Sequence, residues 1–347
     1  MGGNLFKNIS RHGTKRLEEK SFKITKILES FSIDYRHIPY LSEKSSHGDL
    51  DIIVSRETLT DDFIEYIVNN FQYAINGKFT NYWLLEEHQR VEVKHKLDTL
   101  SFNYDGLQTD LIVISQESID FSQMYHAYND LGGIIGCITK QLGYNLGREG
   151  LFNEHVPIDG YGKYKIYLTK DFSVFLDKFE LDDSIYYGDK TLANVQELFE
   201  YLKSWKYFNS DWMNPHLMNA TRRNRAAKRK VFNEVTDLAN NQGGVLNWTS
   251  KAPLLLTFDN NIEEQIRRNT EHAQYKKDTK LSMSKERLVN VLGYEPDNIN
   301  QVFMAISNDF GGPQYAREKL YTMSDKDYHK YLLDIMEKLY ATENPNS

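Results

Sequence analysis

The chain has 347 residues, a length that suits two or three ordinary domains. With 40% hydrophobic and 13% aromatic residues, its composition excludes a disordered or collagen-like protein, and a net charge of −7 argues against a surface coated in basic residues. No apolar run approaches the roughly 18 residues that span a bilayer, and residues 1–16 lack the apolar centre of a secretory signal. We therefore expect a cytoplasmic protein with no membrane partner.

The first 115 residues alternate between helical and strand-like patterns. Helical spacing of apolar residues predicts helices over 16–31 and 57–72, the second capped by Thr58 or Thr60. Strand-like patterns occupy 34–41, 49–55, 78–85, 91–104 and 107–115. The order α-β-β-α-β-β-β predicts an α+β domain, in which a mixed sheet carries its helices on one face.

A second, small module follows, and a third completes the chain. Helical patterns cover 118–129, 131–143, 171–179 and 193–205, and short strand-like pieces occur at 150–152 and 163–169. Beyond about residue 209 the chain is polar and mostly helical, ending in a clear helical pattern at 325–340. We therefore predict modules over residues 1–130, 131–208 and 209–347.

Three aspartates begin two of the predicted strands. Asp49 and Asp51 are two residues apart, so their side chains point to the same side of a strand. Asp110 begins another strand that continues into a buried apolar run. If the two strands are neighbours, three carboxylates meet at the rim of the sheet, which predicts a site for Mg²⁺ or Mn²⁺. A pair of Asp residues alone is a weak signal, because surface pairs are common.

Three carboxylates also suit phosphoryl transfer with two metal ions. We expect Asp49 and Asp51 to bridge both ions, with the second ion carrying the triphosphate of a nucleotide. Asp110 is expected to complete the shell of the first ion and to orient or deprotonate the attacking hydroxyl.

The motifs resemble a known superfamily. SSHGDLDIIV with LQTDLIVIS resembles the polymerase-beta type of nucleotidyltransferase, whose signature is Gly-Ser, a short gap, Gly-Asp-hydrophobic-Asp and a distant Asp. NLGREGLF followed by LTKDFSVFLDKFEL resembles the thumb of family X DNA polymerases, and MGGNLFKN resembles the start of small phage-encoded members. The resemblance covers about residues 1–207. It implies a polymerase-beta-like palm over 1–130, a small α/β thumb-like module over 131–208, and the host cytoplasm as location if the chain is phage-encoded.

One departure from the signature concerns the phosphate grip. The Gly-Ser of the superfamily should lie nine or ten residues before Asp49, where this chain has Pro39 and Tyr40. Serine hydroxyls, backbone N–H groups and a lysine in the intervening turn can replace it, although each is also an ordinary turn residue. The nucleotide-binding candidates are Ser42, Lys44, Ser45, Ser46 and Gly48.

A basic segment lies near the start of the third module. It can be a solvated helix face, a surface for a partner protein or a contact for nucleic-acid phosphates, and the resemblance favours the last. Its residues are Arg222, Arg223, Arg225, Lys228, Arg229 and Lys230.

Together these features predict an enzyme that transfers a nucleoside monophosphate from an NTP or dNTP to a hydroxyl and releases pyrophosphate. The expected acceptor is the 3′-end of a nucleic acid. Two alternatives stay open: transfer to a hydroxyl of a protein or small molecule, and an inactive nucleic-acid-binding protein of the same fold. The oligomeric state does not follow from the sequence.

Overall fold

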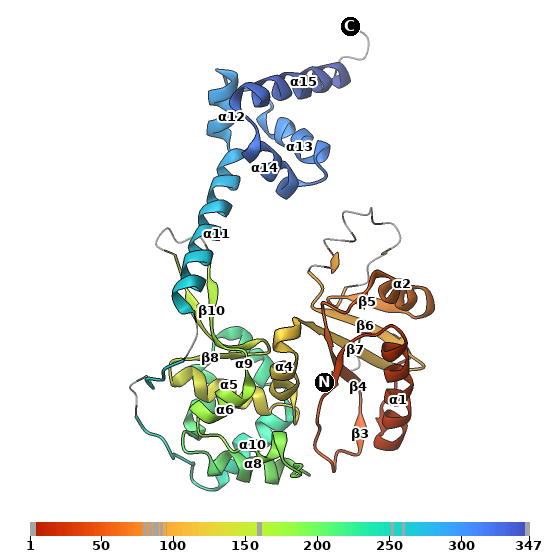
Figure 1. Cartoon of the computed structure of the whole chain (residues 1–347), viewed down its shortest axis with the longest axis vertical. Helices are drawn as coiled ribbons and strands as arrows, with labels where there is room; N and C mark the ends of the chain where they lie inside the picture. The colour runs from red at the N-terminus through yellow and green to blue at the C-terminus, as the bar shows by residue number, and fades with distance from the viewer. Residues whose placement is uncertain are drawn as a thin grey trace. The chain divides into compact units, whose positions relative to one another are not determined.

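The computed structural model describes residues 5–78, 96–157, 162–250, 253–258 and 261–343, with positions 82, 85, 90, 93 and 94. The chain forms two compact units (Figure 1). The first consists of Met1–Asn153 and Tyr167–Asn260, and the second of Glu154–Ile166 and Asn261–Ser347. The protein has the α+β architecture that the sequence predicts.

A five-stranded mixed sheet forms the N-terminal part of the first unit. Its strand order is β2-β4-β7-β6-β5, in which β4 and β7 run parallel and the other neighbours antiparallel. The strands are β2 (Tyr35–His37), β4 (Asp49–Ser55), β5 (Tyr73–Ile75), β6 (Thr99–Tyr104) and β7 (Leu107–Ile114). Because β4 and β7 are parallel neighbours, their N-terminal ends meet at one rim of the sheet.

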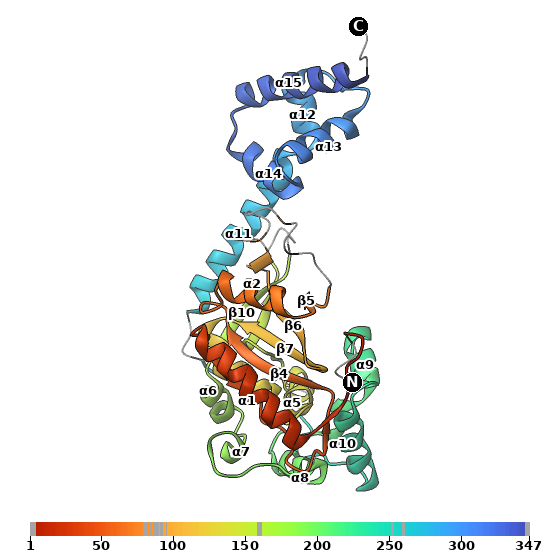
Figure 2. The same ribbon diagram turned by 90° about the vertical axis from the view of Figure 1, so that its right-hand side faces the viewer.

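Helices α1 (Thr14–Ser30) and α2 (Asp61–Asn70) pack on one face of this sheet (Figure 2). Every second residue of β4, namely Leu50, Ile52 and Val54, joins the core beneath them. Thr60 caps α2 by accepting a hydrogen bond from the backbone N–H of Phe63, as expected from the sequence. The apolar alternation therefore turns one face of β4 toward the helices and leaves Asp49 and Asp51 on the opposite face.

That opposite face is covered only in part by α4 (Ile119–His126). Ile119 packs there against Ile53 and Ile114, at the C-terminal ends of β4 and β7. The aspartates lie at the other end of these two strands, beyond this apolar patch.

Several local details differ from the sequence-based expectations. Strand β5 was not predicted, and Ser46–His47 forms β3, which pairs with β1 (His12–Gly13) where a plain turn was expected. The strand predicted over 91–104 is shorter in the structure, where β6 begins at Thr99. The strand predicted over 78–85 lies largely outside the described residues.

The rest of the first unit is mainly helical. Gly132, in α5, brings two backbones together, because a Cβ at this position would lie 2.0 Å from the carbonyl oxygen of Tyr125. This part of the chain also contains a three-stranded sheet of order β10-β9-β8, of which residues 154, 155 and 164–166 belong to the second unit. The elements are α5 (Leu131–Gln141), β8 (Asn145–Gly147), β9 (Gly150–His155), β10 (Tyr164–Thr169), α6 (Phe172–Lys178), α7 (Ser184–Tyr187), α8 (Val195–Ser204), α9 (Ala220–Ala226) and α10 (Lys230–Asn241), with 3₁₀ turns at Gln116–Ser118, Ser210–Met213 and Pro215–Leu217.

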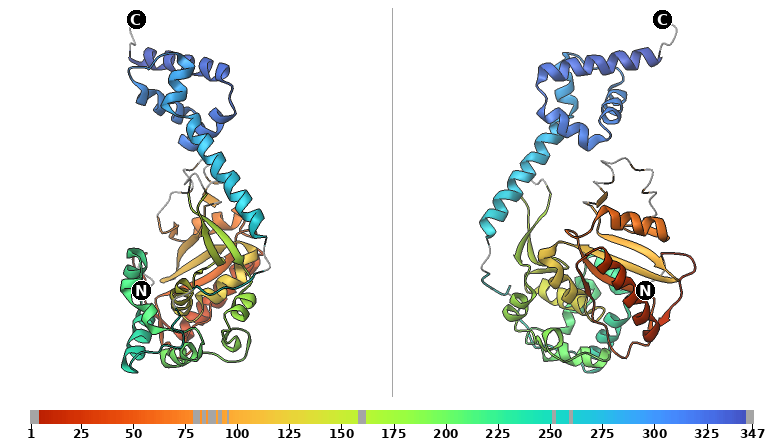
Figure 3. Two further views of the ribbon diagram at one scale, coloured as in Figure 1. Left: turned by 90° about the vertical axis from the view of Figure 1, so that its left-hand side faces the viewer. Right: turned by 45° about the vertical axis from the view of Figure 1, so that its right-hand side comes forward.

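The second unit contains a helical bundle, in agreement with the predicted helical C-terminal region (Figure 3). Its helices are α11 (Ile262–Ser282), α12 (Lys285–Leu292), α13 (Ile299–Asp309), α14 (Pro313–Thr322) and α15 (Asp325–Glu343). Leu288, Ile306, Leu320 and Leu332, from four different helices, meet in its core. Among the described helices of the chain, none has the length and apolar character needed to cross a membrane.

Candidate metal centre

The three predicted aspartates converge on the open face of the sheet. In the parallel pairing of β4 with β7, Asp51 lies directly beside Asp110 and Asp49 beside Gln108. One carboxylate oxygen from each of Asp49, Asp51 and Asp110 lies within 4.8 Å of the other two. The geometric prediction that these acids meet at one rim is confirmed.

The apolar residues that follow each aspartate explain why the arrangement is fixed. The core beneath α1 and α2 contains alternate residues of both strands, namely Leu50, Ile52 and Val54 of β4 and Leu111 and Val113 of β7. A slip of one residue in either strand would turn its buried side chains to the wrong face of the sheet. The core therefore sets the register that brings the carboxylates together.

Their proximity changes the acid–base properties of the group. Asp51 is open to water on one side, and protein atoms surround it on the others. This desolvation, together with the charges of Asp49 and Asp110, raises the pKa of Asp51 to about 8. Desolvation and then the charge of Asp110 also raise the pKa of Asp49. Three carboxylates at this spacing are thus costly to ionise together.

This set of donors fits a divalent cation. Carboxylate oxygens are the hard ligands that Mg²⁺ and Mn²⁺ prefer, and a cation would offset the desolvation and the mutual repulsion that raise the pKa of Asp51. Asp49, Asp51 and Asp110 could therefore hold a metal ion.

Asp110 has an additional partner that the sequence analysis did not identify. The side-chain amide of Gln108 donates to both carboxylate oxygens of Asp110, at 2.9 and 3.2 Å. Gln108 is two residues before Asp110 on β7, so the same alternation that was used for Asp49 and Asp51 places both side chains on one face.

Asp49 and Asp51 open into a cleft of about 1090 Å³ within the first unit. Four of the five nucleotide-binding candidates, Lys44, Ser45, Ser46 and Gly48, line it with Asp49 and Asp51. The fifth, Ser42, is an exposed turn residue whose backbone N–H donates to the carbonyl oxygen of Leu192 at 3.1 Å.

Lys44 is the cation of this turn that lies nearest to the acids. Burial lowers the pKa of Lys44, whereas the charges of Asp49 and Asp51 act in the opposite direction. Arg11, which the sequence analysis did not single out, also lines the cleft. Its guanidinium donates to the carbonyl oxygen of Ser46 at 2.9 Å and to the hydroxyl of Ser46 at 3.2 Å. Lys44 of this turn and Arg11, which is bonded to the turn, thus both line the cleft with Asp49 and Asp51.

The basic segment is divided between two places. Arg222, Arg223 and Arg225 belong to α9, whereas Lys228, Arg229 and Lys230 line the cleft. The Arg229 guanidinium forms an ion pair with the buried carboxylate of Asp130. Asp130 also accepts a hydrogen bond from the backbone N–H of Phe232 at 3.3 Å, which fixes the start of α10. Arg229 thus has a structural partner in addition to its place in the cleft.

Three histidines, His37, His47 and His126, line the cleft. His47, in β3, is buried, with its ring centroid 4.9 Å from that of Tyr40. His126 lines the cleft, and its Nδ1 lies 2.8 Å from the carbonyl oxygen of Ser122, so this nitrogen carries the proton and donates. Burial lowers the pKa of His126 to about 4. His126 is therefore a neutral side chain of the cleft, which no sequence pattern indicated.

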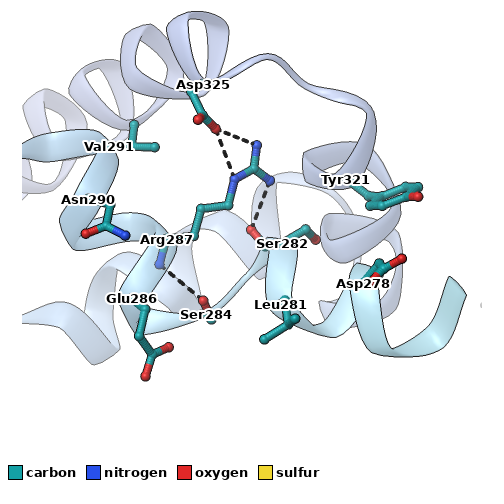
Figure 4. Close-up of a pocket in the computed structure, with 10 residues that line it drawn as sticks. All are labelled: Asp278, Leu281, Ser282, Ser284, Glu286, Arg287, Asn290, Val291, Tyr321 and Asp325. Atoms are coloured by element: carbon teal, nitrogen blue, oxygen red, sulfur yellow. Dashed lines mark hydrogen bonds and ion pairs between the residues drawn. The ribbon is translucent and has the colours of Figure 1, made fainter. Parts of the chain in front are cut away.

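A second hollow, of about 730 Å³, lies in the helical bundle (Figure 4). Its central cation, Arg287, donates to the carbonyl oxygens of Leu320 and Met323 at 2.7 and 2.9 Å. It also pairs with Asp325 at 3.0 Å. Because its donors are engaged by the surrounding helices, Arg287 acts as a structural tie in this hollow.

Comparison with known protein families finds no match for this sequence, and comparison with curated proteins finds none either. The case for a function therefore depends on the geometry and chemistry of the site.

Proposed function

We propose that this protein is a metal-dependent nucleotidyltransferase of the polymerase-beta type. The observation that carries the proposal is the convergence of Asp49, Asp51 and Asp110 from two parallel strands onto an open face of the sheet. A surface cluster of acids would ordinarily spread apart to reduce repulsion, whereas here two strands with buried cores hold the charges together.

In the proposed reaction, the oxygen of an acceptor hydroxyl attacks the α-phosphorus of a nucleoside triphosphate. A new O–P bond forms, the bond between the α-phosphorus and its bridging oxygen to the β-phosphate breaks, and pyrophosphate leaves. Asp49, Asp51 and Asp110 would hold a metal ion, which would supply positive charge for the phosphate oxygens and for the developing alkoxide.

The protein's own groups have separate tasks in this scheme. Asp110 orients the acceptor hydroxyl and takes up its proton, directly or through water. Lys44 and Arg11 bind oxygens of the triphosphate, since both cations line the cleft that holds Asp49. The turn with Lys44 thus takes over the task of the Gly-Ser pair that this chain lacks.

We propose a nucleic-acid 3′-end as the acceptor. Support comes from α9, where Arg223 and Arg225 are exposed and Arg222 partly exposed, next in sequence to the cleft residues Lys228 and Lys230. Clustered cations of this kind bind the phosphates of a nucleic acid irrespective of base sequence.

The decisive experiment incubates the full chain with Mg²⁺, each labelled NTP or dNTP, and single-stranded, gapped and RNA oligonucleotides. We expect a labelled oligonucleotide, and its loss in Asp49→Ala and Asp51→Ala. Asp189→Ala, which changes an exposed aspartate outside the residues that line the cleft, serves as the matched control.

Other outcomes would identify the alternatives. Label on the protein itself or on an added small alcohol, with no extended oligonucleotide, would replace the proposed acceptor. Absence of metal-dependent nucleotide binding, combined with retained binding of DNA or RNA, would identify an inactive nucleic-acid-binding protein and overturn the proposal.

A further inference from the structure

Gln108 occupies a special position beside the candidate metal centre. It is 6% exposed, lies next to Asp49 across the β4–β7 pairing and donates to both oxygens of Asp110. When both oxygens of a carboxylate accept hydrogen bonds from one amide, rotation of the carboxylate is restricted. The remaining lone pairs of Asp110 then point in directions that the protein sets.

The other end of the Gln108 amide is also engaged. Its carbonyl oxygen accepts a hydrogen bond of 2.9 Å from the backbone N–H of Leu5. These two contacts define the orientation of the amide, because an exchange of its oxygen and nitrogen would bring like partners together at both ends. Gln108 therefore connects Leu5 to Asp110.

The segment that contains Leu5 is itself anchored to the turn between β6 and β7. Phe6 is 6% exposed, and the backbone N–H of Ser10 donates to the carbonyl oxygen of Gly106 at 3.1 Å. The Nε2 of His12 donates to the same carbonyl oxygen at 3.2 Å. Residues 5–12, here called the N-terminal strap, thus lie along the turn that leads into β7.

We infer that Gln108 is a positioning residue for Asp110, and that the N-terminal strap holds Gln108 in place through the backbone N–H of Leu5. This inference rests on the proposed metal-dependent function. Partners that orient metal ligands in this way commonly influence metal affinity as strongly as they influence turnover.

Gln108→Met tests the first contact, because methionine has a similar size and no amide. We expect the affinity for Mn²⁺, measured by electron paramagnetic resonance on the full chain, to fall about tenfold or more. Thermal unfolding without metal provides the check on folding. The matched control is Gln116→Met, which removes an amide-to-carboxylate bond of 2.6 Å to Asp34, and it should leave the Mn²⁺ affinity unchanged.

A pair of substitutions at Leu5 tests the second contact without changing the sheet. Leu5→Pro removes the backbone N–H, whereas Leu5→Ala keeps it and shortens the side chain. We expect Leu5→Pro to weaken Mn²⁺ binding about threefold relative to Leu5→Ala, as for the loss of one hydrogen bond. If Gln108→Met fails to fold, the comparison of the two Leu5 variants still tests the positioning role of Gln108.

The outcomes separate this inference from the proposed function. Equal Mn²⁺ affinities in Gln108→Met and the unaltered chain, or in the two Leu5 variants, would overturn the positioning role while leaving the nucleotidyltransferase proposal in place. Failure of the unaltered chain to bind Mn²⁺ would overturn both.

Discussion

Two charged centres of this protein differ in how their charges are compensated. At the rim of the sheet, Asp49, Asp51 and Asp110 bring three carboxyl groups together, with one oxygen of each within 4.8 Å of the others. In the helical bundle, Arg287 is surrounded by carbonyl oxygens, the carboxylate of Asp325 and the face of the Tyr328 ring, 5.0 Å away.

This difference supports the proposal of a ligand site at the rim of the sheet, whereas Arg287 stabilises the fold of the bundle. Arg287 connects α12 to α14 and to the start of α15, because its guanidinium donates to the carbonyl oxygen of Leu320 and to the carboxylate of Asp325. The carboxylates repel one another. Desolvation and this repulsion raise the pKa of Asp51 to about 8. A cation that binds these carboxylates would offset their repulsion and so stabilise the folded protein.

The largest effect should follow removal of the carboxylates. Asp51→Ala is expected to lower nucleotidyl transfer at least about a thousandfold, because a metal ion commonly supplies several kcal/mol to the transition state. The measurement is the initial rate of incorporation at saturating Mg²⁺. A variant with more than a tenth of the original rate would remove Asp51 from the metal centre.

Arg287 should matter for stability instead. Arg287→Met leaves the carbonyl oxygens of Leu320 and Met323 without their charged donor, and we expect a loss of about 2 kcal/mol in the free energy of unfolding of the bundle. Hydrogen exchange of α12 to α15 measures this loss. The control is Arg268→Met, which removes a largely exposed ion pair with Glu264 and should cost under about 0.5 kcal/mol. A change in Mn²⁺ affinity would contradict the division between the two centres.

The basic segment offers a smaller effect on binding. Replacement of Arg222, Arg223 and Arg225 by serine should weaken DNA or RNA binding about tenfold and reduce the slope of log affinity against log salt by about 3. Titrations at several salt concentrations give both values. An unchanged slope would show that α9 does not contact phosphates.

The smallest effect concerns the neutral histidine of the cleft. Burial lowers the pKa of His126 to about 4, so the unfolded chain binds a proton more readily than the folded chain between about pH 6.5 and 4. The stability that His126 contributes is complete above pH 6.5 and is lost as the pH falls through this range. With allowance for its partial exposure, the loss by pH 5 should be about 1 kcal/mol.

His126→Gln should therefore flatten the decline of thermal stability between pH 7 and 5. His216→Gln, on the exposed Pro215–Leu217 turn, is the control. Parallel pH profiles for the unaltered chain and His126→Gln would contradict the assigned protonation state.

The sequence was most informative where a local pattern is compatible with a single arrangement of the backbone. Alternation placed Asp49 and Asp51 on one side of a strand, and the apolar residues after Asp110 predicted a second strand. Their pairing was an assumption, which the structure confirms. The cap at Thr60 could likewise be predicted, because its hydroxyl precedes a clear apolar helix face.

Other features depend on contacts between distant segments and leave no local pattern. The bond from Leu5 to Gln108 joins positions 103 residues apart, and the ion pair of Arg229 with Asp130 joins positions 99 apart. Strand β5 is only three residues long, too short for a recognisable period, and exists because it pairs with β6. Such features become visible only when the fold brings the partners together.

The central claim is that Asp49, Asp51 and Asp110 jointly bind a divalent cation, and the most direct measurement is anomalous diffraction from crystals grown with Mn²⁺ and a non-hydrolysable nucleoside triphosphate. We predict a manganese peak bonded to oxygens of all three carboxylates, with the triphosphate on the side of Lys44. A manganese peak elsewhere, or a triphosphate bound away from these aspartates, would contradict the account.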